Sequence, residues 1–183
     1  VPPEQLIKDR AEFAEKGIAR GRSIAFVEYA GGVLLIGENP GSSLRKLAEI
    51  YDRVAFAGVG RFNEFELLRV AGIRYADLKG YSYGRADVTA RGLANAYSQT
   101  LSQIFTHETK PYEVEILVAE VAPAEANGTE LFRIQYDGTL RTESRYGAIG
   151  GRAEELADGL AEAWADDLDL PGVVALAATK IEA

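Results

Sequence analysis

The chain has 183 residues, of which 47% are apolar and 26% charged, and its net charge is −8. It contains no cysteine and one histidine, which excludes disulfides, thiol nucleophiles, cysteine-ligated metals and histidine-rich metal sites. The acidic balance argues against an extended nucleic-acid surface, which needs clustered lysine and arginine. No cofactor is expected, and the length is that of a single domain, residues 1–183.

The termini give expectations about location and processing. No apolar run approaches the roughly 18 residues of a membrane span. The first residues show no basic segment leading into an apolar core, so a cytoplasmic protein without a secretory signal is expected. Because the chain contains no methionine, Val1 is not expected to be the first residue of the gene.

The first predicted element is a helix. Ile7, Ala11, Ala14 and Ile18 recur at spacings that place them on one helical face, after Pro2 and Pro3. Residues 23–29 and 33–38 are apolar runs on either side of Gly31-Gly32, a pattern that predicts a β-hairpin. A second strand pair is expected at residues 46–51 and 53–59.

The middle of the chain is predicted to be helical. Phe62, Phe65 and Leu68 share one face of a first helix, which Gly72 is expected to weaken near its end. Asp87 is predicted to cap a longer second helix. The apolar face of that second helix consists of Leu93, Tyr97, Leu101, Ile104 and Phe105.

Strands return after residue 110. Residues 112–118 alternate apolar positions with Glu113 and Glu115, a pattern that predicts a strand. Asp137-Gly138 predicts a hairpin turn between residues 131–136 and 139–146. Two closing helices are expected around residues 156–164 and 173–181. Segregated blocks of strands and helices indicate an α+β fold in which two antiparallel sheets lie between helical layers.

One long stretch resembles a known family. Residues 49–106, EIYDRVAFAGVGRFNEFELLRVAGIRYADLKGYSYGRADVTARGLANAYSQTLSQIFT, followed by KPYEVEILVAEV, are similar to the α-type subunit of actinobacterial proteasomes. The earlier ARGRS and GGVLLIGENP fit the same family, and the resemblance covers about residues 4 to 170. It implies the four-layer αββα sandwich of the N-terminal-nucleophile hydrolases.

The resemblance also implies that this chain has no catalytic residue. Proteolytic β subunits of the family carry a threonine at a free N-terminus, whose own amine serves as the base. Here Ser23 begins the matching strand, but a helix precedes it, so Ser23 has no free α-amine. The implied role is that of a structural subunit, seven copies of which form an outer ring that gates substrate entry and docks activators.

The resemblance assigns a binding role to two residues of this sequence. Lys46 matches a lysine that binds the C-terminal carboxylate of an activator tail in a pocket between subunits, and Gly60 matches a glycine of that pocket. Residues 1–20 are expected to form the N-terminal helix and gate-proximal segment. Arg20, at its end, and Arg22, just after it, are either surface charges or contacts of the gate. The implied partners are proteasome β subunits, a ring-shaped ATPase or other activator, and unfolded substrates, with neither nucleic acid nor membrane.

The family continues beyond the last helix with two strands and usually another helix, whereas this sequence stops at Ala183, so these C-terminal strands are expected to be missing. Two other functions stay open from the sequence. One is a self-compartmentalising hydrolase in which processing exposes Ser23. The other is a stand-alone binding domain, which would be a monomer.

Overall fold

The structure is a computed structural model that describes residues 1–38, 46–121 and 128–182. Its helices and strands follow the predicted block order of helix, strands, helices, strands and helices. The elements are α1 (Pro3–Ala19), β1 (Ile24–Tyr29), β2 (Gly32–Gly37), β3 (Leu47–Tyr51), β4 (Val54–Gly60), α2 (Phe62–Ser82), η1 (Arg85–Asp87), α3 (Ala90–His107), β5 (Val114–Glu120), β6 (Glu130–Ile134), β7 (Leu140–Glu143), β8 (Tyr146–Ile149), α4 (Ala153–Ala163) and α5 (Leu170–Glu182).

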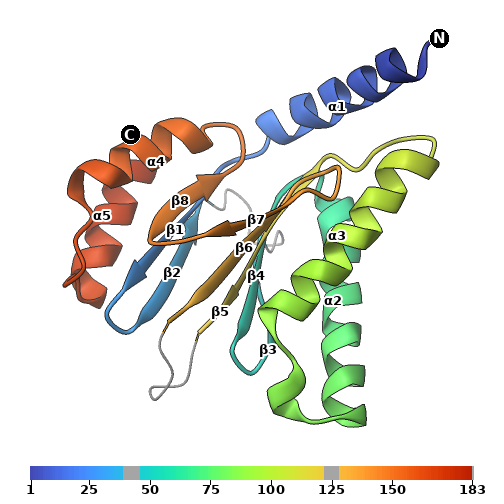
Figure 1. Cartoon of the computed structure of the whole chain (residues 1–183). Coiled ribbons are helices and arrows are strands. Elements are labelled where there is room, and N and C mark those ends of the chain that lie inside the picture. Colours follow the sequence, from blue (N-terminus) through green and yellow to red (C-terminus); the bar gives the residue numbers. More distant parts are fainter. Residues whose placement is uncertain (39–45, 122–127, 183) are drawn as a thin grey trace.

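Two antiparallel sheets lie between two helical layers (Figure 1). The larger sheet has the order β3-β4-β5-β6-β7 and is covered by α2 and α3, whereas the smaller has the order β2-β1-β8 and is covered by α4 and α5. This is the four-layer α+β sandwich that was predicted, with two antiparallel sheets between helical layers, so the predicted fold class is confirmed.

Three separate groups of buried side chains fill the three interfaces between these four layers. Successive side chains of β4 point to opposite faces of the sheet and so enter different groups. Phe56 packs toward α2 and α3, whereas Ala57 and Val59 pack toward the smaller sheet. On β1, Phe26 faces the larger sheet and Val27 faces α5. Each sheet is therefore apolar on both faces, as layers inside a sandwich must be.

The strand predicted at residues 112–118 is confirmed as β5, and the burial of both sheet faces extends to its acidic residues. Glu113 and Glu115 are not on a solvated face, because β5 is the central strand of its sheet and both of its faces are covered. Their charges are compensated by cations: Glu113 by Lys110 and Arg61, and Glu115 by Arg133. A buried carboxylate without such partners would be costly.

Two helix boundaries also differ from expectation. Gly72 does not weaken the end of α2, which continues to Ser82. A Cβ at Gly72 would lie 2.0 Å from the hydroxyl of Tyr97, so this glycine lets α3 approach α2 closely. Asp87 does not cap α3 either. It belongs to η1, and Thr89 accepts a bond from the backbone N–H of Gly92 at 3.1 Å.

The predicted strand at residues 139–146 is two strands in different sheets. The turn at Asp137-Gly138 forms as predicted, and β7 pairs with β6. The chain then turns at Arg145, whose φ is 67°, and β8 pairs antiparallel with β1 in the other sheet. The connection between β7 and β8 thereby joins the two sheets of the sandwich.

α1 lies across one end of the sandwich and its N-terminal end projects away from the sheets (Figure 1). The helix is confirmed, but the predicted apolar face is only partly buried. Ala14 and Ile18 are buried. Ile7 is 56% exposed, and the side chains of Leu6 and Phe13 are each about half exposed. The second half of α1 packs on the sheets and its first half offers apolar side chains to solvent.

Candidate functional site

The segment that joins α1 to β1 contains Arg20, Arg22 and Ser23, which the sequence analysis singled out, and it separates two cavities. Gly21 donates its N–H to Ile18 O at 2.9 Å, which turns the chain at the end of α1. A Cβ at Gly21 would lie 2.7 Å from Cγ1 of Val59, so the segment runs close over the end of β4. Gly21 lines a cavity on each side of this segment, a role that no sequence pattern indicated.

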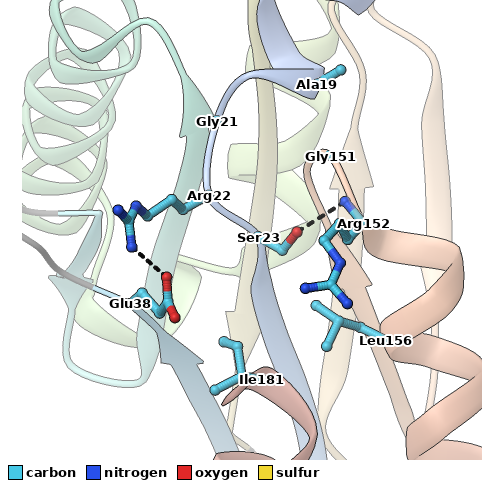
Figure 2. A pocket seen from close by; sticks show the side chains of 9 residues that line it. All are labelled: Ala19, Gly21, Arg22, Ser23, Glu38, Gly151, Arg152, Leu156 and Ile181. Atoms are coloured by element: carbon cyan, nitrogen blue, oxygen red, sulfur yellow. Dashed lines mark hydrogen bonds and ion pairs between the residues drawn. The ribbon is translucent and has the colours of Figure 1, made fainter. Parts of the chain in front are cut away.

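The first cavity, here the Ser23 cavity, has a volume of about 220 Å³. Figure 2 shows its walls, which come from the α1–β1 segment, the end of β2 and the helices α4 and α5. Its lining residues are Ala19, Gly21, Arg22, Ser23, Glu38, Gly151, Arg152, Leu156 and Ile181.

Polar groups of the Ser23 cavity pair with one another. Ser23 Oγ accepts a bond from the backbone N–H of Arg152 at 3.0 Å. Arg22 points away from Ser23 and pairs with Glu38 (Figure 2). The Arg152 guanidinium pairs with Glu155. Within the described part of the chain, no carboxylate, imidazole or amine accepts a hydrogen bond from Ser23. A hydroxyl without a neighbouring base is a poor nucleophile.

Lys46 lies at the start of β3, beside the wall of this cavity. Its ammonium donates to the carbonyl oxygen of Arg22 at 2.9 Å, and its own carbonyl accepts the N–H of Gly58 at 2.9 Å. Burial lowers the pKa of Lys46, and the nearby Arg22 lowers it further, while Glu38 acts in the opposite direction. Lys46 is thus a half-buried cation held next to the chain that leaves α1.

The second cavity, here the Gly60 cavity, lies on the other side of Gly21 and has a volume of about 360 Å³. Gly60 has a φ of 122°, and a Cβ there would lie 1.9 Å from the carbonyl oxygen of Glu113. The backbone therefore requires glycine at position 60 whether or not a ligand binds. The lining residues are Gly17, Arg20, Gly21, Gly60, Arg61 and Glu113.

A charged cluster that the sequence did not reveal forms one wall of the Gly60 cavity. The Glu113 carboxylate lies 3.0 Å from the ammonium of Lys110 and 3.4 Å from the guanidinium of Arg61. Glu64 also pairs with Lys110 at 3.0 Å and accepts the N–H of Glu113 at 3.0 Å. These groups come from α2, from the end of β4 and from the residues before β5, so only the folded chain brings them together.

The cluster also positions α1. A Cβ at Gly17 would lie 2.2 Å from Oε1 of Glu113, so the last turn of α1 rests directly on this carboxylate. Arg10, which lies nearer the N-terminal end of α1, donates hydrogen bonds to the carbonyl oxygens of Phe105 at 2.7 Å and Glu108 at 2.6 Å. The positive charge of Arg10 thereby satisfies the free carbonyls at the C-terminal end of α3.

The predicted site residues are therefore neighbours but do not share one cavity. Arg20 and Gly60 line the Gly60 cavity, Arg22 lines the Ser23 cavity, and Lys46 bonds to the chain between the two. Among residues 1–38, 46–121 and 128–182, no three histidine or acidic side chains are placed to hold a metal ion. No helix in the same ranges is long and apolar enough to cross a membrane.

Comparison with known proteins identifies the relatives of this chain. A family model described as "Proteasome subunit" matches residues 18–183. "Proteasome subunit alpha" of Xylanimonas cellulosilytica is 56% identical over the whole chain and 75% of its own length. The protein of the same name from Sanguibacter keddieii is 56% identical over 96% of this chain and 69% of its own length. That from Nocardioides sp. is 55% identical over 99% of this chain and 71% of its own length.

Proposed function

The chain belongs to the proteasome subunit family, and we propose that it is the non-catalytic α subunit of a cytoplasmic bacterial core proteasome. The observation that carries the proposal is the position of Ser23. Its nitrogen is in a peptide bond after α1, and the buried Ala14 and Ile18 anchor that helix to the sheets. A nucleophile that needs its own free amine is thus blocked by a helix that forms part of the fold.

Catalysis in such a particle would reside in β subunits, and this chain would contribute a barrier. Copies of it would form a heptameric outer ring whose N-terminal segments close the axial pore to folded proteins. The half-exposed apolar side chains on the first part of α1 support this assembly, since a second copy could bury them. Arg20 and Arg22, which follow α1 directly, would lie near the gate.

Opening the gate would need an activator that binds the open state more tightly than the closed one, since equal affinity shifts no population. We assign Lys46 to the carboxylate of the activator tail, with Gly60 nearby. The half-buried ammonium of Lys46 supports this role, because partial burial strengthens its attraction for an anion. Its bond to Arg22 O links it to the segment that leaves α1.

One experiment separates this function from the two alternatives. Native mass spectrometry of the purified chain, with its intact mass, should show a ring of copies that each retain α1. Mixed with β subunits, the ring should form a larger particle that hydrolyses a fluorogenic peptide, whereas the ring alone should not. A chain that begins at Ser23 and hydrolyses the peptide alone would support the hydrolase instead, and a stable monomer would support the binding domain.

A further inference from the structure

The N-terminal half of α1 is attached to the rest of the fold at very few points, and its end projects away from the sheets (Figure 1). Every residue from Pro3 to Asp9 is exposed to solvent. The hydrogen bond from Gln5 to Asp9 stays within the helix. Within the part of the chain that the structure describes, Arg10 is the first residue of α1 whose side chain hydrogen-bonds to another element. Two exposed turns of helix are marginal in water, so their order depends on this first anchor.

Arg10 is anchored on the C-terminal end of α3. Its Nε donates to the carbonyl oxygen of Phe105 at 2.7 Å, and its Nη2 donates to that of Glu108 at 2.6 Å. Longer bonds run from Nη1 to Thr109 O at 3.3 Å and from Nη2 to Ile104 O at 3.4 Å. The guanidinium also lies 5.7 Å from the centre of the Phe105 ring. One side chain thereby caps a helix end whose last carbonyls lack intrahelical donors.

From Phe13 onward, α1 is held without Arg10. The ring of Phe13 lies 5.4 Å from the ammonium of Lys110. Ala14 and Ile18 are buried against the sheets. Packing therefore fixes the C-terminal half of the helix, whereas the first turns depend on one guanidinium.

We propose that Arg10 is the positioning residue of α1, and that its cap on α3 keeps the first turns folded and aimed at a second copy of the chain. This inference rests on the proposed ring and names the residue that prepares the helix for it. The apolar side chains presented in this way are Leu6, Ile7 and Phe13. Without the cap, residues 3–9 would lose helical order, and assembly would have to restore that order at a cost in affinity.

The geometry of the cap requires arginine. A guanidinium has five N–H groups in a planar fork, and all three nitrogens of Arg10 donate to carbonyl oxygens. Arg10→Lys keeps a positive charge near the C-terminal end of α3, which favours cations, but offers one nitrogen in place of three. Arg10→Gln removes the charge as well. A role of charge alone would therefore be restored by lysine, whereas a positioning role would not.

Hydrogen-exchange mass spectrometry of the purified chain measures the order of α1. In Arg10→Gln the peptides that cover residues 3–13 should exchange about ten-fold faster, because hydrogen bonds from a charged donor are lost. Arg10→Lys should exchange nearly as fast. Tyr136→Phe is the matched control, since it removes a bond of 2.7 Å from Tyr136 to Glu15, in the packed half of α1. This control should leave residues 3–13 unchanged, and β4 and β5 should be unchanged in all variants.

Native mass spectrometry over a dilution series measures the consequence for assembly. If the ordered fraction of α1 falls ten-fold, the apparent affinity between copies falls about ten-fold as well. Rings of Arg10→Gln and Arg10→Lys should therefore dissociate at higher concentrations than rings of the unmodified chain. Ile7→Ser loses an apolar contact but keeps Arg10. At an equal extent of dissociation, its residues 3–13 should exchange more slowly than those of Arg10→Gln.

The outcomes separate this proposal from the proposed function. Unchanged exchange in Arg10→Gln, with rings present, would leave the ring standing and overturn the role of Arg10. Faster exchange with rings of unchanged stability would show that the order of the first turns does not serve assembly, which also overturns the proposal. Full recovery in Arg10→Lys would reduce Arg10 to a charge at the end of α3. An unmodified chain that stays monomeric would overturn the proposed function and this proposal together.

Discussion

The two cavities beside Gly21 differ in how their charges are paired. In the Ser23 cavity each guanidinium has a carboxylate partner, and Ser23 accepts a bond from a backbone N–H. In the Gly60 cavity the guanidinium of Arg20 has no partner among residues 1–38, 46–121 and 128–182, and that of Arg61 lies 3.4 Å from its carboxylate partner, Glu113. Internally paired groups give little to a ligand, so the Ser23 cavity is a structural junction and the Gly60 cavity is suited to binding.

Removal of α1, which leads into the segment between the two cavities, should have the largest effect of the tests below. Deletion of residues 1–18 removes Gly17 from the Gly60 cavity and also the exposed apolar side chains of the first turns. We expect smaller particles by native mass spectrometry. Because the deletion also removes the buried Ala14 and Ile18, Ile7→Ser serves as the milder variant that keeps the packed half of the helix. Rings of unchanged size in both variants would contradict an assembly role for α1.

The next largest effect is expected at Gly60. Gly60→Ala combines an unfavourable positive φ with a Cβ only 1.9 Å from the carbonyl oxygen of Glu113, so the backbone must move. The free energy of unfolding should fall by about 3 kcal/mol or more. Urea-induced unfolding measures this change.

Gly128→Ala is its control. Gly128 has a similar φ of 108°, but no atom of the described residues lies within 4 Å of a Cβ built there. Only the backbone conformation is then penalised, by about 1 kcal/mol. Equal losses at the two positions would show that the contact with Glu113 does not matter and that Gly60 was required for its φ alone.

Lys46 tests whether the binding site extends across the segment between the cavities. Lys46→Ala should weaken tail binding by about 1.5–3 kcal/mol, as for a hydrogen bond to a charged group. A purely superficial ion pair would cost below about 1 kcal/mol. Peptide titration of assembled particles distinguishes these ranges, and ring assembly should survive.

The pH dependence of tail binding sharpens the same test. Burial and Arg22 lower the pKa of Lys46, so its ammonium loses its proton at lower pH than an ordinary lysine. The Lys46-dependent part of tail affinity should be complete below that pKa and disappear as the pH rises through it. Titrations of Lys46→Ala and Lys46→Arg particles are the references, since neither side chain deprotonates in this range. An identical pH profile in all three particles would exclude a role for the charge of Lys46.

The sequence predicted individual helices and strands well, but it predicted poorly which residues line the cavities. The two apolar runs on either side of Gly31-Gly32 located the first hairpin correctly, because both signals are local. Family resemblance led to Lys46, Gly60, Arg20 and Arg22. It did not reveal that Glu113 lies beside Arg61, because these residues are distant in the sequence and meet only where β4 pairs with β5.

The same limit explains the errors. The burial of Glu113 could not be predicted, because alternation tells which residues share a face but not whether that face is covered. The covering elements, α1 and the smaller sheet, are far from Glu113 in sequence. Likewise, the switch of sheet between β7 and β8 depends on Arg145 adopting a positive φ, which no glycine signalled.

Ser23 should give the smallest effect, and it tests the structural interpretation of the first cavity. Ser23→Ala removes one hydrogen bond, from the N–H of Arg152, at a partly exposed position, so the free energy of unfolding should fall by about 0.5–1.5 kcal/mol. Peptide hydrolysis by the complete particle should not change. Ser98→Ala is the control, since Ser98 also makes one hydrogen bond to the backbone, with Gly138, but lines neither cavity. If both variants lose a similar amount of stability and neither loses activity, Ser23 is a support for the turn before α4. A loss of hydrolysis in Ser23→Ala alone would instead make this serine a nucleophile, and the chain would have to be assigned to the hydrolase alternative.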